Sequence, residues 1–353
     1  MKVSQRTVHL ELTEPLRISR STMAARDAVW LFIEYEGQLG RGEAVTSVYY
    51  GLDARTIVRL LNEVALDLAR FGDPETALGA LRTGALSANR MPPAVTAAVE
   101  SALLDLTGKR AGVPVHELLG TTAPPSAATA RTIGITSPGQ AEAEAARLAR
   151  DGFSVLKIKA GAPDPEDDLK RVRAVRAAAP HARLLLDPNG AWTVSTTERL
   201  LPRLAELGIE AVEQPIAPGD PETLAKLAER SPLPVIADED AVGYEDARRL
   251  AGRVQGINVK LAKCGGVTAA LRIAELIEGT GTELMLGCLT ASTLGIAPAV
   301  HLADRARWID LDGHLLLAQD PWTGIGGADG TVRVSRHPGL GVRPRTEAES
   351  ERA

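Results

Sequence analysis

The sequence is poor in aromatic residues and in cysteine. Phe, Trp and Tyr together make up 3% of the 353 residues, and Cys264 and Cys288 are the only thiols. Aromatic platforms on which nucleic-acid bases could stack are therefore scarce, and a formal net charge of −5 also argues against a nucleic acid partner. Two thiols in a chain of this length do not make a disulfide framework, and there is no C-x-x-C metal motif.

Long apolar runs are missing too. The N-terminal MKVSQRTVHLELTEPLRISR has no uncharged apolar stretch of signal-peptide length, and no later run reaches the about 20 residues of a membrane span. We expect a protein of the cytoplasm that binds neither nucleic acid nor membrane and that assembles as a homo-oligomer. The 44% hydrophobic and 24% charged residues are typical of a globular chain with a large core.

Residues 1 to about 120 show strand patterns followed by helical patterns. VHLEL and AVWLFIEYE alternate apolar and polar residues, as half-buried antiparallel strands do. The second segment leads into GQLGRG, which we predict to be a hairpin turn. Helical patterns follow in ARTIVRLLNEVALDLARF, PETALGALRTG and AVTAAVESALLDLTGKRAG. This order predicts an α+β unit.

From about residue 129, short apolar runs alternate with amphipathic helices. The runs are RTIGI, VLKIKA, RLLLDPN, EAVEQP, PVIADED, GINVKLAK, ELMLGC and RWIDLDG. Strands separated by helices must pair in parallel, because parallel pairing needs a crossover connection. Eight such strands predict a closed α/β barrel. The alternative is an open doubly wound sheet, but no glycine-rich phosphate loop follows the first strand.

Three acids stand at the C-terminal ends of consecutive predicted strands. Asp187 ends LLLD, Glu213 follows AV, and Asp238 ends VIAD. A buried carboxylate is costly unless it is paired or binds a metal, and strand ends converge on the catalytic face of a barrel. Three empty acids would repel one another, so we expect them to hold Mg²⁺, with Mn²⁺ as an alternative. The competing interpretation is that each acid caps the helix that follows it.

Lysines flank these acids. Lys157 and Lys159 lie two positions apart in VLKIKA and therefore share one face of a strand. Their proximity and burial should lower the pKa of the pair and make a neutral lysine available as a general base. Lys260 and Lys263 come from the far side of the barrel. The competing interpretation is that the lysine stems line a surface strand.

Acids and lysines in this arrangement predict proton transfer at carbon. A substrate carboxylate binds the metal, one lysine removes the α-proton, and negative charge develops on an enediolate that the metal stabilises. A lysine on the opposite face can return the proton and invert the centre. Two bases that face one carbon therefore predict racemisation or epimerisation.

Together these segments resemble the enolase superfamily, muconate-lactonising-enzyme subgroup, over nearly the whole chain. The matching segments are LKIKAG, LLLDPNGAW, AVEQP, VIADED and NVKLAKCGG, in the family's order and spacing. The resemblance implies an α+β capping domain on a modified TIM barrel, (β/α)7β. The capping domain would span residues 1–122 and be completed by the tail at about 320–353, whose last ten residues we expect to be disordered. The barrel would span residues 123–319.

The resemblance also implies roles for single residues. Asp187, Glu213 and Asp238 would bind Mg²⁺. Lys159 and Lys260 would act as acid and base, with Lys157 beside them, and Lys263 and Asn189 would support the site.

The end of the barrel resembles dipeptide epimerases. DLDG is similar to their Asp-x-Asp motif, and Asp310 and Asp312 would face the same way to bind a substrate ammonium group. The alternative is a solvated loop or a salt bridge to Arg307. RTIGI is similar to their first strand, with Thr132 as a substrate contact. MLGCLTAS is similar to their seventh strand, with Cys288 beside the substrate backbone.

Two loops of the capping domain, residues 17–27 and 46–53, would set the specificity. Arg20 would pair with an acidic substrate side chain, as in L-Ala-D/L-Glu dipeptides, or would be an ordinary exposed arginine. Tyr50, next to Tyr49, would wall the pocket or pack the domain interface.

We therefore predict a Mg²⁺-dependent dipeptide epimerase that inverts the C-terminal residue of a dipeptide. The alternatives are an N-acylamino-acid racemase, an o-succinylbenzoate synthase or another epimerase of the superfamily. Thr290 stands where many subgroup members have an acid, which counts against cycloisomerase and o-succinylbenzoate synthase activity. A catalytically inactive metal-binding scaffold could have discarded the lysines, and both Lys159 and Lys260 are present.

Overall fold

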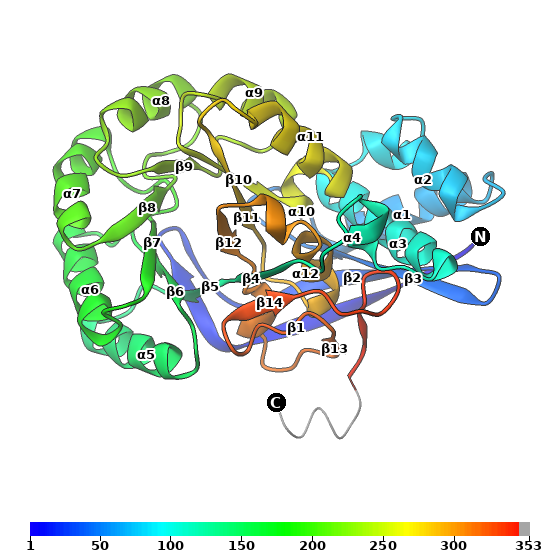
Figure 1. The fold of residues 1–353 in the computed structure, drawn as a ribbon, viewed down its shortest axis with the longest axis horizontal. Helices are drawn as coiled ribbons and strands as arrows, with labels where there is room; N and C mark the ends of the chain where they lie inside the picture. Colours follow the sequence, from blue (N-terminus) through cyan, green and yellow to red (C-terminus); the bar gives the residue numbers. More distant parts are fainter. Residues whose placement is uncertain (346–353) are drawn as a thin grey trace.

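Alternating polar and apolar residues at the N-terminus form a three-stranded antiparallel sheet. The computed structural model describes residues 1–345 and shows β1 (Lys2–Ile18), β2 (Ser21–Tyr35) and β3 (Gln38–Val45) paired in that order (Figure 1). The strands predicted at VHLEL and AVWLFIEYE are confirmed as parts of β1 and β2.

The segment GQLGRG lies mostly within strand β3, so its prediction as a turn is wrong. The turn is formed by Glu36 and by Gly37, the first residue of the segment, whose φ angles are 49° and 76°. Positive φ at both central residues matches the twist of the flanking strands. A glycine of GQLGRG is needed for packing instead, because a Cβ on Gly40 would lie 2.2 Å from the carbonyl oxygen of Ala102 in a later helix. Close backbone approach and tight turns both favour glycine, so the sequence pattern did not separate them.

Helices follow this sheet, as predicted. They are α1 (Ala54–Leu68), α2 (Pro74–Arg82), the 3₁₀ helix η1 (Ser87–Arg90), α3 (Pro93–Ala111) and the short α4 (Val115–Leu118). Asp53 and Asp73 begin α1 and α2 by accepting hydrogen bonds from backbone amides three residues later. Helix α3 is buried along most of its length because it packs between the sheet and the barrel.

Eight parallel strands form the second part of the molecule, and neighbours pair in sequence order (Figure 1). The strands are β5 (Ala130–Ile133), β6 (Val155–Lys159), β7 (Arg183–Asp187), β8 (Ile209–Glu213), β9 (Val235–Ala237), β10 (Gly256–Lys260), β11 (Glu283–Gly287) and β12 (Trp308–Asp310). The crossover helices are α5 (Pro138–Arg150), α6 (Pro165–Ala178), α7 (Val194–Glu206), α8 (Pro221–Arg230), α9 (Tyr244–Leu250), α11 (Val267–Ile277) and α12 (Thr293–Val300). The predicted (β/α)7β barrel with an α+β cap is confirmed.

Two of the predicted strands end earlier than their sequence patterns. After β10, the residues LAKC form the one-turn helix α10 (Leu261–Cys264), so Lys263 lies on a helix. Strand β12 stops at Asp310, and Asp312 precedes the 3₁₀ helix η3 (Gly313–Leu316). The prediction that Asp310 and Asp312 share a strand is therefore wrong.

An apolar layer fills the N-terminal end of the barrel. It consists of inward side chains from seven strands, Ala130, Val155, Leu185, Ala211, Ile236, Met285 and Trp308. Side chains alternate along a strand, so the residues two positions further on also point inward. Those residues are polar in most strands: Thr132, Lys157, Asp187, Glu213, Asp238, Asn258 and Asp310. The candidate site therefore rests directly on the apolar layer.

Gly256 of β10 leaves room for this layer. A Cβ at Gly256 would lie 2.8 Å from both the Ile236 side chain and the Trp308 ring. We expect Gly256→Ala to lower the free energy of unfolding by about 1–3 kcal/mol through overpacking, measured by chemical denaturation. The control is Gly139→Ala in α5, where an added Cβ meets nothing within 4 Å. Equal stability of the two variants would contradict this account of the packing.

The first and last barrel strands are joined by side chains. Within residues 1–345, β5 and β12 share no backbone ladder. Instead, Leu311 N donates to Thr129 Oγ1 at 2.9 Å, and Thr132 N donates to Asp312 Oδ2 at 2.7 Å. Asp312 thus helps to close the barrel.

The C-terminal tail contacts both parts of the molecule. Val115 N donates to Gly339 O at 2.9 Å, and Leu340 N donates to Asp105 Oδ1 of α3 at the same distance. Strand β14 (Thr331–Arg333) pairs with β4 (Ser126–Ala128), which precedes the barrel. The division into residues 1–122, 123–319 and a completing tail stays a prediction.

The end of the chain was predicted to be disordered. Within its last ten residues, Pro344 lies in strand β15 (Arg343–Pro344), which pairs with β13 (Trp322–Thr323). Residues 346–353 lie outside the described residues.

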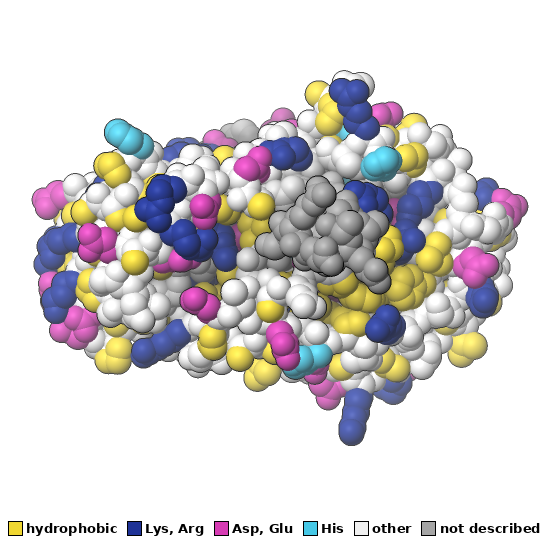
Figure 2. Space-filling model, turned by 90° about the horizontal axis from the view of Figure 1, so that it is seen from below, with side chains coloured by type: hydrophobic (Ala, Val, Ile, Leu, Met, Phe, Trp, Pro, Cys, Tyr) yellow, Lys and Arg dark blue, Asp and Glu magenta, His cyan; other side chains and the backbone are white. Residues whose placement is uncertain are grey.

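No helix within residues 1–345 is both long enough and apolar enough to cross a bilayer. The face drawn in Figure 2 carries basic and acidic side chains interspersed with apolar ones.

Candidate active site

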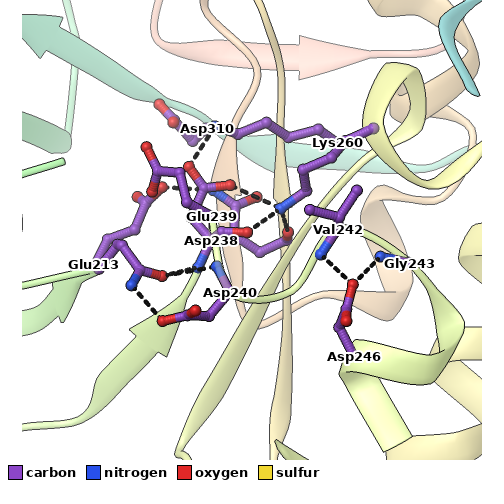
Figure 3. A network of polar contacts seen from close by, with 12 residues as sticks. Glu213, Asp238, Glu239, Asp240, Val242, Gly243, Asp246, Lys260 and Asp310 are labelled. Carbon is purple, nitrogen blue, oxygen red and sulfur yellow. Dashed lines mark hydrogen bonds and ion pairs between the residues drawn. The ribbon is translucent and has the colours of Figure 1, made fainter. Parts of the chain in front are cut away.

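The strand ends bring the three predicted acids together at the C-terminal end of the barrel. Asp187 ends β7, Glu213 ends β8, and Asp238 directly follows β9. Their relative exposures are 0%, 1% and 2%, so all three are buried. Three consecutive strands of one sheet therefore each deliver a buried carboxylate to the same end of the barrel. Figure 3 shows two of them, Glu213 and Asp238, with Lys260 beside Asp238.

Lys157 lies among these acids. Its Nζ is 3.1 Å from Asp187 Oδ2, 2.5 Å from Glu213 Oε2 and 2.7 Å from Asp310 Oδ2. Its side chain is 2% exposed, so a substrate cannot reach it directly. Lys157 therefore serves as the counter-ion of the buried acids.

Lys159 and Lys260 occupy more open positions on either side. Lys159 Nζ pairs with Asp187 Oδ2 at 2.5 Å, and Lys260 Nζ pairs with Asp238 Oδ2 at 2.7 Å. Their side chains are 12% and 13% exposed. Strands β6 and β10, which carry them, are four apart in a barrel of eight. The two lysines thus stand on opposite walls with the three acids between them.

A further set of polar side chains orients the acids. Lys263 Nζ donates to Asp238 Oδ1 and to the backbone oxygen of Asn258, both at 2.8 Å. Asn258 Nδ2 donates to Glu213 Oε1 at 2.8 Å. Gln214 Oε1 accepts from Asp238 N at 3.0 Å. The acids are held by a connected network, which limits their motion.

Local charges shift the pKa values of these acids in different directions. Burial raises the pKa of Glu213 to about 8, and the charges of Asp187 and Asp238 add to that rise. Burial also opposes ionisation of Asp238, but Lys260 and Lys263 outweigh it and hold its pKa well below the usual range. The nearby ammonium groups of Lys157 and Lys260 lower the pKa of Glu213 but do not offset this rise.

The expected fall in lysine pKa is wrong for Lys157. Burial alone would lower the pKa of Lys157, but the carboxylates of Asp310, Glu213 and Asp187 outweigh it and raise the pKa well above the usual value. The prediction considered burial and the neighbouring ammonium group but not the carboxylates. In the fold, the Lys157 ammonium lies within 3.1 Å of three of them.

Two residues that follow the acids have a strained backbone. Asn189 and Gln214 have φ angles of 50° and 37°. Such conformations are costly for residues other than glycine and persist where surrounding contacts enforce them. Asn189 N donates to Asp187 Oδ1 at 2.8 Å, and Asn189 Nδ2 lies 3.2 Å from Asp187 Oδ2. The strain turns both segments back toward the site.

The unsatisfied atoms around the site match the ligands of a hard cation. Four buried oxygens lack a hydrogen-bond donor: Asn189 Oδ1, Glu239 Oε2, Asn258 Oδ1 and Asp310 Oδ1. Within residues 1–345, however, no three acidic, histidine or cysteine side chains are grouped closely enough to hold a metal ion as they stand. The donor set fits Mg²⁺ in chemistry, and the lysine ammonium groups now neutralise the carboxylates.

The two acids of DLDG have different partners. Asp310 pairs with Lys157, and its Oδ1 is free. Asp312 accepts from Thr132 N and lies 3.4 Å from Arg131 Nη1. The alternative salt bridge to Arg307 is not found among the described ion pairs, where Arg307 lies over the Trp308 ring. Asp310 faces the site, and Asp312 joins the barrel ends.

Arg20 connects the capping sheet to the strand ends. It lies in the turn between β1 and β2, and its Nη1 donates to Glu239 Oε1 at 2.7 Å and to Asn189 O at 3.1 Å. Its guanidinium lies 4.6 Å from the centre of the Tyr49 ring. Arg20 is thus a bonded element of the site.

The remaining predicted residues border the site more loosely. Burial raises the pKa of Tyr50, and the nearby charge of Asp238 adds to the rise. Burial likewise raises the pKa of the Cys288 thiol, with Asp312 and Asp310 contributing. Thr290 is buried. Tyr50 and Cys288 lie within electrostatic range of the acids, and neither forms a hydrogen bond to them among the described contacts.

Sequence reasoning missed Asn258, Gln214 and Glu239. A signal existed for Asn258, because it lies two residues before Lys260 in an apolar strand and so shares its inward face. Gln214 and Glu239 directly follow predicted metal ligands, but nothing in a single sequence separates such residues from ordinary loop residues.

Comparisons with known proteins match this architecture. The model of the mandelate racemase / muconate lactonizing enzyme N-terminal domain matches residues 1–120, and the enolase C-terminal domain-like model matches residues 140–348. An L-Lys-D/L-Arg epimerase of Methylococcus capsulatus is 36% identical over 96% of this chain and 98% of its own. A hydrophobic dipeptide epimerase of Roseobacter litoralis is 33% identical over 97% of this chain and 98% of its own.

A solved structure is similar over nearly the same length. The dipeptide epimerase of Enterococcus faecalis, complexed with Mg and the dipeptide L-Leu-L-Tyr, superposes with a TM-score of 0.88 at 32% identity. The superposition covers 96% of this chain and 98% of that one. The strand-end site and these matches show that the chain belongs to the mandelate racemase / muconate lactonizing enzyme family of the enolase superfamily.

Proposed function

We propose that this chain is a Mg²⁺-dependent dipeptide epimerase, an isomerase that inverts the α-carbon of the C-terminal residue of a dipeptide. The observation that carries the proposal is the pair of partly exposed lysines, Lys159 and Lys260, on opposite walls of the barrel. The acids Asp187, Glu213 and Asp238 lie between them.

The lysines perform the inversion. Lys159 and Lys260 approach a bound α-carbon from opposite faces, so one removes the proton and the other delivers a proton to the far side. Lys157 and Lys263 stay buried and hold the acids in place. Mg²⁺ bound by Asp187, Glu213 and Asp238 would supply positive charge to the substrate carboxylate as the α-carbon is deprotonated.

Asp310 provides the contact for the other end of the substrate. Its Oδ1 is buried and has no hydrogen-bond donor. A dipeptide ammonium group would satisfy this oxygen with a charge-assisted hydrogen bond. Thr132 of β5 and Cys288, which directly follows β11, lie on the two sides of the strand that carries Asp310, where the substrate backbone would pass. The relatives named above, which act on dipeptides or bind Mg and a dipeptide, support this assignment.

The second candidate is an N-acylamino-acid racemase. It is favoured by the fact that Asp310 Oδ2 already pairs with Lys157 and Asp312 Oδ2 already accepts from Thr132 N. An N-acyl substrate has no ammonium group and needs no free acid. The free Asp310 Oδ1 remains unexplained in that case, so we prefer the dipeptide substrate.

A substrate panel in D₂O tests the proposal. We expect the protein with Mg²⁺ to exchange the α-proton of the C-terminal residue of dipeptides, followed by proton NMR. A site that binds an ammonium group rejects analogues without it, so kcat/KM for the N-acetyl amino acid should be at least about 100-fold lower. No deuterium in any dipeptide would contradict the proposal, and exchange in N-acetyl amino acids alone would establish the second candidate.

The cytoplasmic location, the homo-oligomer and the absence of a nucleic acid partner stay predictions.

A further inference from the structure

The side chain of the inverted residue would lie under the capping sheet. The proposed Mg²⁺ would hold the substrate carboxylate near Asp187, at the end of β7, and Asp238, directly after β9. Arg20 binds the loops that leave these same two strands, through Asn189 O and Glu239. Arg20 and the aromatic ring stacked on it therefore border the position of the residue whose carboxylate is bound.

The charge of Arg20 is already neutralised. Its Nη1 donates to Glu239 Oε1 at 2.7 Å, and the Glu239 side chain is 2% exposed. The guanidinium carbon of Arg20 also lies over the Tyr49 ring, 4.6 Å from its centre. An acidic substrate side chain would have to compete with a buried carboxylate for Arg20. A basic side chain would find the Glu239 carboxylate buried and already paired with Arg20 through Oε1.

The Tyr49 ring lies next to Arg20, and the Tyr50 ring packs against it. Val48, Tyr49 and Tyr50 are consecutive residues of the loop after β3, and their relative exposures are 101%, 48% and 38%. The Tyr49 and Tyr50 rings contact each other edge to face, with centres 4.9 Å apart. Few other large apolar side chains in residues 1–345 are this exposed. An exposed apolar group at a site mouth indicates an apolar ligand.

We propose that the inverted residue of the preferred dipeptide carries an uncharged apolar side chain, aliphatic or aromatic, which packs against Tyr49 and Tyr50. This inference rests on the proposed function and adds the substrate class. Arg20 becomes a positioning residue that ties the β1–β2 turn, the loop after β3 and the barrel together. This assignment replaces the prediction that Arg20 receives an acidic side chain.

The first test is a dipeptide panel with one variable residue. L-Ala-L-Leu, L-Ala-L-Phe, L-Ala-L-Glu and L-Ala-L-Lys are compared by α-proton exchange in D₂O with Mg²⁺. We expect kcat/KM for Leu and Phe to exceed that for Glu and Lys by about tenfold or more. A best substrate with Glu or Lys would overturn the inference while leaving the proposed function intact. Exchange in none of the four would contradict the proposed function itself.

Freeing Arg20 gives the second test. Glu239→Gln removes the charge that neutralises Arg20, so kcat/KM for L-Ala-L-Glu relative to L-Ala-L-Leu should rise at least about tenfold. The matched control is Glu222→Gln, which breaks an exposed pair with Arg253 on the outer helix α8 and should leave the ratio unchanged. An unchanged ratio in folded Glu239→Gln protein would overturn the role given to Arg20.

Tyr50→Ala keeps the inference testable if Glu239→Gln fails to fold. We expect kcat/KM for L-Ala-L-Phe to fall about tenfold more than that for L-Ala-L-Ala, because the small side chain does not reach the removed ring. The competing occupant of this surface is a second copy of the chain. A changed oligomeric state in size-exclusion chromatography, with an unchanged substrate ratio, would assign the loop to that interface and overturn the inference.

Discussion

Lys159→Ala and Lys260→Ala are each expected to stop epimerisation of the preferred dipeptide, with a loss in kcat of about a hundredfold to ten-thousandfold. Inversion needs a proton removed from one face and returned on the other. The two lysines stand on strands β6 and β10, four apart in the barrel, so neither can serve both faces. Chiral chromatography of the product measures the loss.

The two variants should differ in a second measurement. Each variant keeps one lysine, so it should exchange the α-proton only in the diastereomer whose proton faces that lysine. Proton NMR in D₂O with the L,L and L,D dipeptides, taken separately, should give opposite patterns for the two variants. Opposite exchange patterns in the two variants would not arise if the lysines only stabilised the fold.

The matched control is Lys170→Ala, which removes an exposed lysine of α6 that pairs with Asp167 on the surface. It should retain the activity of the unaltered protein. If both active-site variants continued to exchange both diastereomers, the assignment of two opposed bases would be wrong.

Mg²⁺ is expected to raise the thermal stability of the metal-free protein. A ligand that binds only the folded chain at 100 times its dissociation constant contributes about 2.7 kcal/mol to the free energy of unfolding. The buried carboxylates of Asp187, Glu213 and Asp238 indicate where this stabilisation would arise. Thermal denaturation followed by circular dichroism over a range of Mg²⁺ concentrations measures it without any activity assay.

Asp238→Asn should lose most of this stabilisation, since it removes one carboxylate of the proposed set. Asp167→Asn changes an exposed carboxylate of α6 and should leave the Mg²⁺ effect unchanged. An equal rise in melting temperature for Asp238→Asn and the unaltered protein would place the cation elsewhere. No rise in the unaltered protein at millimolar Mg²⁺ would remove the metal from the proposal.

The buried charges were readable from sequence because they interrupt apolar strands. Asp187, Glu213 and Asp238 each stand at the end of a short apolar run, at spacings that fit a strand and a helix. The alternation of side chains along a strand also placed Lys157 and Lys159 on one inward face, where the structure has them. These inferences use local periodicity, which depends only on neighbouring residues.

The sequence did not separate residues whose local patterns are the same. Asp310 and Asp312 look alike in DLDG, yet one pairs with Lys157 on β6 and the other accepts from Thr132 N on β5. Lys157 and Lys159 look alike in VLKIKA, yet Lys157 is enclosed by three carboxylates and Lys159 borders the open site. Their partners come from strands far away in the chain.

The amino-acid sequence by itself determined the barrel, the cap, the three acids and the two opposed lysines, because strand periodicity and polar residues within apolar runs can be read from neighbouring positions. Only the tertiary structure decided that Arg20 is bound to Glu239, more than 200 residues away, and that the half-exposed Tyr49 ring lies against it. Ion pairs and exposure depend on which distant segments meet in space. The metal and base chemistry therefore follows from the sequence pattern, whereas the substrate side chain follows from contacts between the cap and the barrel.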